Sequence, residues 1–278
     1  MIFGQKILRS VRDTSPFSHS AARLLSVAGK GNSTVEEIVK VVECDAVLTA
    51  NVLKAAAPAA SVRLAVETLG AKEVVRVALD SCASQLYQSP LEGYDSEKGA
   101  LWRHSLKTAL AARALAEFSK DGLDPGSAFT GGILHDIGKV IISAFLKDLS
   151  TSFGAEFLTH DNGSYLDVER RKLGTDHCEA GAALAEYWQL PGFHVDVIRA
   201  HHRPAESRPE SIGLVYAIHL GDLVAMLSGA GTGVDSLKYQ LDHNCAQHFD
   251  LTFERLAQTL LKTELEFEKL SSAMQSSD

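Results

Sequence analysis

Residues 131–140 read GGILHDIGKV, a stretch in which glycine and aliphatic residues surround His135 and Asp136, with Lys139 three positions later. The wider run at 127–146, SAFTGGILHDIGKVIISAFL, has the composition of a buried core segment. Burying a polar group without a partner costs roughly 2–7 kcal/mol, and burying a charge costs more. We therefore expect other parts of the chain to supply partners for these three side chains.

Apolar residues recur with a helical period along nearly every long segment. In 33–57, one stripe contains Val35, Ile38, Val39 and Val42. Ser33 or Thr34 is expected to cap this helix, a break is expected at Cys44, and Gly70 is expected to hinge the next helical pair. No segment alternates with a period of two for long enough to form a strand. The sequence therefore predicts an all-α protein, built as a helical bundle.

The bulk composition excludes several classes of protein. The chain has 278 residues, a net charge of −8 and a pI near 5.8, which argues against nucleic-acid binding through a basic surface. Charges and glycines interrupt the longest apolar runs, and the N-terminus lacks the apolar core of a secretion signal, so we expect neither a membrane span nor export. The four cysteines show no CxxC spacing and are typical of reduced thiols in a cytoplasmic protein.

The stretch QSPLEGYDSEKGA at 88–100 is rich in Pro, Gly, Ser and acidic residues and is the best candidate for an internal boundary. We expect an N-terminal helical part at 1–90 and a second helical part at 91–278 that carries the chemistry. The two parts can also form one continuous unit.

Further polar residues stand where the apolar pattern predicts burial. These candidate partners of His135 and Asp136 are His104, His177, His201, His202 and Asp222. Helical bundles build metal sites from inward-facing His and Asp or Glu side chains. A ligand set of only nitrogen and oxygen suits iron, manganese, zinc, nickel or cobalt. The alternative is a core network in which these polar groups bond to each other or to water.

The order H…HD…H…HH…D resembles the HD-domain superfamily of metal-dependent phosphohydrolases. Two N-terminal stretches resemble the HDOD family within it: VECDAVLTANVLKAAAPA at 42–59 and AVETLGAKEVVRVAL at 65–79. The resemblance covers roughly residues 15 to 250 and implies an HDOD-like helical bundle.

Two departures from the family pattern are visible. In the N-terminal part, Cys44-Asp45-Ala46 replaces the usual acidic-Pro pair and Ala57-Pro58 replaces the usual Asn-Ser. HDOD proteins have mostly lost the metal ligands and are regarded as signalling modules, whereas this chain keeps every ligand-type position. The Gly-Tyr-Pro element of the HD-GYP phosphodiesterases does not follow His201-His202, which puts cyclic-di-GMP hydrolysis in doubt.

The resemblance implies a site with two divalent transition-metal ions. Iron or manganese is favoured, with zinc, nickel or cobalt as alternatives. Asp136 would bridge both ions, one completed by His104, His135 and Asp222 and the other by His177, His201 and His202. Asp136 and Lys139 are the candidate catalytic residues, because the lysine lies on the same helical face and could meet a phosphate oxygen.

Two functions remain open from the sequence. One is a two-metal phosphohydrolase or phosphodiesterase that acts on a small phosphoester or nucleotide-like ligand. The other is a non-catalytic signalling or scaffold module with a structural or ligand-sensing metal and a protein partner. A homodimer is a further expectation, since Phe253, Leu256, Leu260 and Leu261 form a C-terminal stripe that suits either the core or a dimer seam.

Overall fold

The fold contains α-helices and short 3₁₀-helices. The computed structural model describes residues 6–7, 24, 27, 33–44, 46–86, 90–147, 164–187, 190–232 and 239–275. Among these residues, β-type pairing is limited to two isolated bridges, Leu91–Ser96 and Ser119–Phe249. The all-α prediction is therefore confirmed for the described part of the chain.

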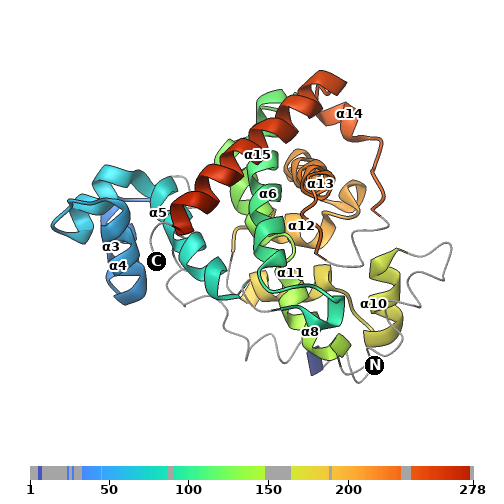
Figure 1. Cartoon of the computed structure of the whole chain (residues 1–278), viewed down its shortest axis with the longest axis horizontal. Coiled ribbons are helices and arrows are strands. Elements are labelled where there is room, and N and C mark those ends of the chain that lie inside the picture. The colour runs from blue at the N-terminus through green and yellow to red at the C-terminus, as the bar shows by residue number, and fades with distance from the viewer. Residues whose placement is uncertain are drawn as a thin grey trace.

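The N-terminal helices form a small group at one side of the molecule (Figure 1). They are α3 (Val35–Glu43), α4 (Ala46–Ala55) and α5 (Val62–Leu86). Thr34 caps α3: its side chain accepts a hydrogen bond from Glu37 N at 3.3 Å, and the Glu37 carboxylate accepts one from Thr34 N at 2.9 Å. Gly70 interrupts α5 with a φ of 75° and a ψ of 161°, which is the expected hinge.

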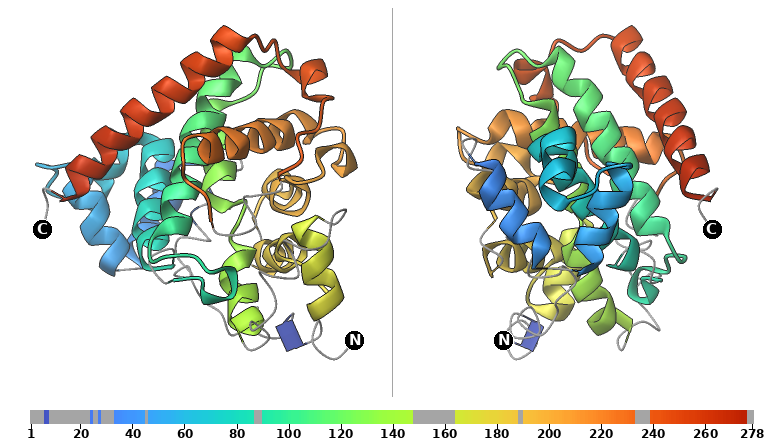
Figure 2. Two further views of the ribbon diagram at one scale, coloured as in Figure 1. Left: turned by 45° about the vertical axis from the view of Figure 1, so that its right-hand side comes forward. Right: turned by 90° about the vertical axis from the view of Figure 1, so that its left-hand side faces the viewer.

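The second part of the chain folds around α6, which runs through the middle of the molecule (Figures 1 and 2). The helices α7 and α13 pack on α6, and α15 crosses it from outside. The bounds are α6 (Ala100–Leu115), α7 (Pro125–Leu134), α8 (Gly138–Lys147), α10 (Tyr165–Leu173), α11 (His177–Tyr187), α12 (Gly192–Ala200), α13 (Ile212–Leu227), α14 (Cys245–His248) and α15 (Phe253–Gln275), with 3₁₀-helices η1 (Glu92–Tyr94), η2 (Ala116–Phe118) and η3 (Pro204–Glu206).

Two glycines of the opening motif are points of close helix contact. A Cβ on Gly132 would lie 2.4 Å from Ala109 Cα, so only glycine lets α7 approach α6 this closely. A Cβ on Gly138 would lie 1.8 Å from the backbone oxygen of His177, so the start of α8 touches the start of α11. These contacts bring α6 and α11 against the turn that carries His135 and Asp136.

The stretch Pro125–Lys147 is long and apolar enough to cross a membrane by length and composition alone. In this structure 83% of its most apolar window is buried within the protein, and the turn at 135–137 divides it into α7 and α8. Its apolar side chains therefore contact the other helices of the bundle.

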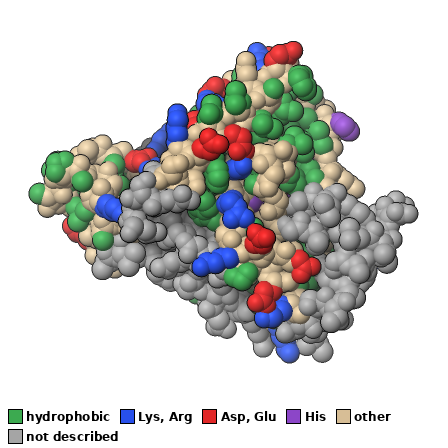
Figure 3. All heavy atoms as spheres, viewed as in Figure 1, with side chains coloured by type: hydrophobic (Ala, Val, Ile, Leu, Met, Phe, Trp, Pro, Cys, Tyr) green, Lys and Arg blue, Asp and Glu red, His purple; other side chains and the backbone are tan. Residues whose placement is uncertain are grey.

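For the C-terminal stripe, the core alternative is wrong at two positions, and the dimer-seam alternative stays a prediction. Thr259 and Thr263 form the buried face of the C-terminal helix, each 1% exposed, whereas Phe253 is 83% and Leu261 is 61% exposed. Two members of the expected stripe therefore lie outside the core, because the threonine face is the one that packs inward. Hydrophobic side chains gather on the surface around α14 and α15 (Figure 3).

Candidate metal centre

The fold brings all seven expected ligand residues into one buried cluster. His104 lies in α6, His135 and Asp136 lie in the turn between α7 and α8, and His177 begins α11. The other three come from the turn after α12 and from the middle of α13: His201, His202 and Asp222. All are buried except His202, which is partly exposed.

The two carboxylate oxygens of Asp136 face two different sets of imidazoles. Oδ2 lies 3.5 Å from His104 Nε2 and 3.4 Å from His135 Nε2. Oδ1 lies 3.5 Å from His177 Nε2 and 3.5 Å from His201 Nε2. This division matches the two coordination spheres expected from the resemblance, although the assignment of ligand roles stays a prediction.

The outer members extend each half of the cluster. Asp222 Oδ1 lies 3.1 Å from His104 Nε2. His202 Nε2 lies 3.2 Å from His177 Nε2, and His104 Nε2 lies 3.2 Å from His135 Nε2.

The outer ring nitrogens of four histidines bond to oxygen acceptors. Nδ1 of His104 bonds to Ala230 O at 2.7 Å, and Nδ1 of His135 bonds to Gly132 O at 2.7 Å. Nδ1 of His201 similarly bonds to the carbonyl oxygen of Ile198 at 3.0 Å. A carbonyl oxygen can only accept, so Nδ1 carries the hydrogen and Nε2 of a neutral ring presents a lone pair to the cluster. This is how proteins fix a metal-binding histidine.

The fourth histidine is held by a carboxylate that the sequence did not single out. The fully buried Glu169 accepts hydrogen bonds from His177 Nδ1 at 2.9 Å and from His177 N at 2.8 Å. Tyr94 in turn donates its hydroxyl hydrogen to Glu169 at 2.6 Å. In the sequence, Glu169 is simply an acidic residue in a segment with a helical pattern. Its separation of eight residues from His177 matches no ligand motif. Asp176 caps α11, because its carboxylate accepts a hydrogen bond from Glu179 N at 2.8 Å.

The pKa directions of both acids and of two imidazoles suit ligands. Burial raises the pKa of the Asp136 carboxyl group. The nearby Lys139 and His135 outweigh this effect and hold the pKa well below its usual range. For Asp222, the effect of burial is outweighed by the hydrogen bond from His104, and the pKa falls to about 2. Burial lowers the pKa of His135, and burial with the neighbouring His201 and His177 lowers that of His202. Both acids are therefore ionised and these two imidazoles neutral near pH 7.

The other three imidazoles differ: burial is outweighed at His104 by Asp222, at His177 by Cys178 and Glu169, and at His201 by Cys178 and Asp136, so their pKa values are raised, that of His201 to about 10. A metal ion would have to displace a proton from these three rings.

The arrangement fits divalent cations. Among the described residues, Asp136 Oδ1 and His201 Nε2 are buried and find no hydrogen-bond partner, which is costly unless another group binds them. Two nitrogens held about 2.0–2.1 Å from one ion, at angles of about 90–110°, lie about 2.9–3.4 Å apart. The 3.2 Å separations of the paired Nε2 atoms fall in this range. The donor set is therefore suited to divalent metal binding.

Three further side chains border the cluster. Lys139 Nζ lies 2.6 Å from Asp136 Oδ2 and donates to Thr232 Oγ1 at 2.9 Å, so its ammonium reaches the centre as expected. Tyr239 stands beside the His202 ring, with centroids 5.9 Å apart, and donates to His219 O at 2.6 Å. Burial and the Asp222 charge raise the pKa of Tyr239 well above its usual value, so the phenol is protonated.

His219 and Cys178 support the centre from behind. His219 Nδ1 bonds to His201 O at 2.7 Å, and its Nε2 accepts from Asp242 N at 2.9 Å, so it ties α13 to the turn that carries His201. Cys178 Sγ lies 4.0 Å from His201 Nδ1, the nitrogen opposite the one that faces Asp136. Its sulfur also lies within 4.8 Å of donor atoms of His177 and His202, so Cys178 is a further candidate donor beside this half of the cluster.

The fold and the cluster define a class: an all-α protein with a buried His/Asp centre suited to divalent metals. The family model of the HDOD domain matches residues 15–204 of this sequence. The chain therefore belongs to the HDOD domain family.

The chain is also similar to three other proteins. A solved protein from Shewanella amazonensis, named as a candidate phosphohydrolase, is 23% identical with a TM-score of 0.66, over 95% of this chain and 97% of that one. A protein from Marinobacter aquaeolei, named as a candidate signal transduction protein, is 22% identical with a TM-score of 0.68, over 92% of this chain and 58% of that one. An uncharacterized protein of Treponema pallidum is 30% identical over 146 residues, which are 49% of this chain but only 28% of that protein.

Proposed function

We propose that the chain is a metal-dependent phosphohydrolase that acts on a small phosphoester, with two divalent ions shared by Asp136. The observation that carries this proposal is the division of the Asp136 carboxylate, with each oxygen facing two imidazole Nε2 atoms at 3.4–3.5 Å. Iron or manganese are the proposed ions, with zinc, nickel or cobalt as alternatives.

Divalent ions held by these residues would supply Lewis acidity and would lower the pKa of a water molecule toward neutral pH. The chain contributes the rest. Asp136 and Asp222 would provide the negative charge that balances the ions. The imidazoles, bound in their neutral form, would hold the ions without adding negative charge. The Lys139 ammonium, which already lies within the centre, can neutralise a phosphate oxygen as a point charge.

We also propose where the protein acts and on what. The substrate is a nucleotide-like or other small phosphoester, and the site of action is the cytoplasm. The acidic net charge of −8 supports a small ligand over a nucleic-acid polymer. A membrane is not a proposed partner.

The test combines metal content with hydrolysis. Protein purified without chelator should contain about two transition-metal ions per chain and should cleave bis(4-nitrophenyl) phosphate. Asp136→Asn should lose most of the metal and the cleavage. The matched control is His243→Gln, because His243 is an exposed histidine away from the cluster and its loss should change neither value. Cleavage at the wild-type rate by metal-free Asp136→Asn would contradict the proposal.

A second function is favoured by the Lys139–Asp136 ion pair at 2.6 Å, because an internal cation already balances the charge of the shared carboxylate. Under this alternative the chain is a signalling or scaffold module with a sensing or structural metal and a protein partner, and a homodimer is its proposed assembly. It predicts metal without turnover across a panel of phosphoesters, and a partner that binds the exposed surface of α3–α5. Metal-dependent hydrolysis that survives substitutions on that surface would count against it.

A further inference from the structure

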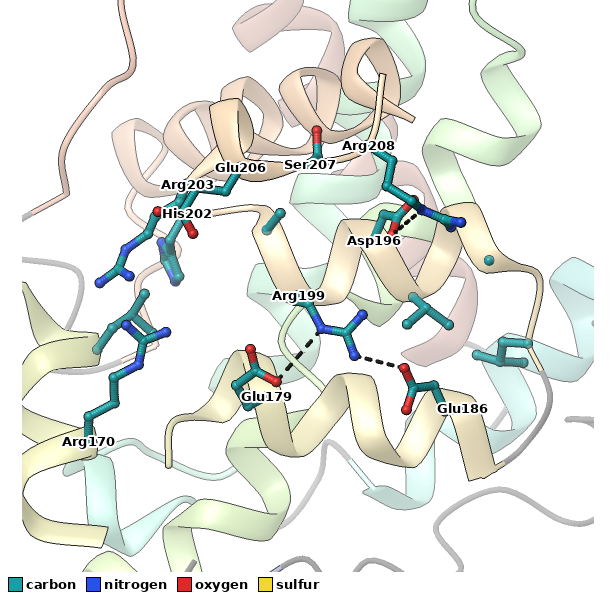
Figure 4. A pocket seen from close by; sticks show the side chains of 15 residues that line it. Arg170, Glu179, Glu186, Asp196, Arg199, His202, Arg203, Glu206, Ser207 and Arg208 are labelled. Atoms are coloured by element: carbon teal, nitrogen blue, oxygen red, sulfur yellow. Dashed lines mark hydrogen bonds and ion pairs between the residues drawn. The ribbon is translucent and has the colours of Figure 1, made fainter. Parts of the chain in front are cut away.

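A pocket of about 590 Å³ adjoins the metal centre and shares one residue with it. Its walls come from α10, α11, α12 and the segment after α12, and His202 stands at one end (Figure 4). Since His202 Nε2 lies 3.2 Å from His177 Nε2, a ligand in the pocket lies next to the cluster. The volume suits a small organic molecule.

At the end far from His202, the arginines of the pocket are already paired. Arg208 binds Asp196 through two nitrogens, Nε at 2.8 Å and Nη2 at 2.8 Å. Arg199 pairs with Glu186 at 2.8 Å and with Glu179 at 3.7 Å. Their charges are therefore balanced within the wall, and this end offers little attraction to an anion.

The two arginines near His202 keep unused donors. Arg170 uses only Nε, which lies 2.5 Å from Asp176, and among the described residues its terminal nitrogens have no acceptor. Arg203 has one long contact, from Nη2 to Asp167 Oδ1 at 3.4 Å. Asp167 is itself engaged in capping α10, since its other oxygen accepts from Ser164 N at 3.0 Å.

Both guanidinium groups lie in the same part of the pocket. The charges of Arg203 and Arg170 both act on the Asp167 carboxylate, and Figure 4 shows the two side chains reaching toward the end beside His202. A planar guanidinium with free donors is suited to hold a phosphate through paired hydrogen bonds. Glu206, three residues after Arg203, also lines the pocket, and its negative charge opposes the binding of a phosphate.

The remaining wall is largely apolar. Its apolar side chains are Leu166, Leu190, Val195 and Ala200, and Gly192 and Ser207 complete the lining. Such a surface favours the organic part of a ligand over inorganic phosphate alone, because burying it releases water from apolar groups on both sides.

We propose that this pocket holds the non-reacting part of the substrate, and that Arg170 and Arg203 bind a second phosphate group on it. The substrate class is then a small organic phosphoester with two phosphate groups, one at the metal centre and one at the arginines. The position of the reacting phosphate rests on the proposed function, whereas anion binding by the arginines does not.

The test uses two dinucleotides that differ in one group: adenylyl-(3′→5′)-adenosine and the same molecule with a 5′-terminal phosphate. Calorimetry on the chelator-treated full chain at low salt measures binding without hydrolysis. The wild type should bind the phosphorylated form at least about tenfold more tightly, which corresponds to about 1.4 kcal/mol. Arg203→Gln should remove this preference, and Glu206→Gln should increase it.

Two further variants make the result specific. Arg170→Lys keeps a cation beside the buried Asp176 but loses the paired donors of the planar guanidinium. It should therefore reduce the preference several-fold without unfolding the chain. Arg199→Gln changes an arginine of the same pocket that is already paired, and it should keep the full preference. Circular dichroism of each variant checks the fold.

Equal affinity for the two dinucleotides, no binding of either, or a preference that persists in Arg203→Gln would overturn the inference. The proposed function fails separately. If bis(4-nitrophenyl) phosphate is not cleaved but the preference is present, the assignment of the pocket is supported and the proposed hydrolase activity is wrong. If cleavage occurs without the preference, only the pocket assignment is wrong.

Discussion

Gly138→Ala tests whether close helix contact builds the metal centre. The added Cβ would lie 1.8 Å from His177 O and 2.7 Å from Gly181 N, and ordinary contact begins at 3.4 Å. The two helices must therefore separate by about 1.6 Å at this point, the difference between these contact distances. The backbone conformation of Gly138 suits alanine, so steric overlap is the main penalty.

The expected cost has two parts. Overpacking of this kind destabilises a protein by about 1–3 kcal/mol, and sometimes by more. For a chain of this size, a loss of about 2–3 kcal/mol lowers Tm by about 5–10 °C. The same movement shifts His177, and metal sites tolerate only about 0.2 Å in a ligand distance. Metal affinity should therefore fall even at temperatures where the variant is folded.

Thermal unfolding followed by circular dichroism gives Tm, and elemental analysis of the folded protein gives metal content. The matched control is Gly213→Ala, because its Cβ would meet Asp121 Oδ2 at 3.4 Å, an ordinary contact, and alanine favours a helix. The control should keep or slightly raise Tm. A Gly138→Ala variant with unchanged Tm and unchanged metal content would refute the reasoning.

The remaining predictions concern three other parts of the molecule. Glu169→Gln should weaken metal binding by about 10–100-fold with the fold intact, because the carboxylate that orients His177 is lost; unchanged affinity in a competition titration would contradict this. Glu264→Ala should cost about 1.5–3 kcal/mol in urea unfolding, because it removes the carboxylate 2.6 Å from the largely buried Lys107, which keeps its bonds to Ser228, and a loss below 0.5 kcal/mol would argue otherwise. Burial lowers the pKa of His194 to about 4 from 6.5, so its contribution to stability is complete above pH 6.5 and is lost as pH falls toward 4. Between pH 7.5 and 5.0 the free energy of unfolding of His194→Leu should therefore fall by about 2 kcal/mol less than that of the wild type, and equal falls would disprove the assignment.

Local chemistry explains what the sequence could predict. The Thr34 cap, the break at Cys44 and the hinge at Gly70 are set by residues within a few positions of one another, and all three are present in the structure. The ligand-type residues were recognisable because a polar side chain in an apolar helical stripe needs a partner. Their order along the chain allowed them to be considered as one set.

Contacts between distant segments were not predictable in this way. Nothing in the pattern around Glu169 indicates that it would support His177, because the turn between α10 and α11 determines that contact. Arg170 and Arg203 resemble any solvated arginines until the fold places them in one pocket. On α15, the core alternative for the stripe is wrong at Leu261, because two threonines bond to their own helix backbone and tolerate burial, which leaves Leu261 outside.

The inward-facing donors come from segments as far apart as α6 and α13, and they face one another only in the folded chain. A bound ion is therefore linked thermodynamically to folding of the helices that carry these donors, and saturation at one hundred times the dissociation constant adds about 2.7 kcal/mol to stability. Metal supply would then govern how long the chain survives proteolysis.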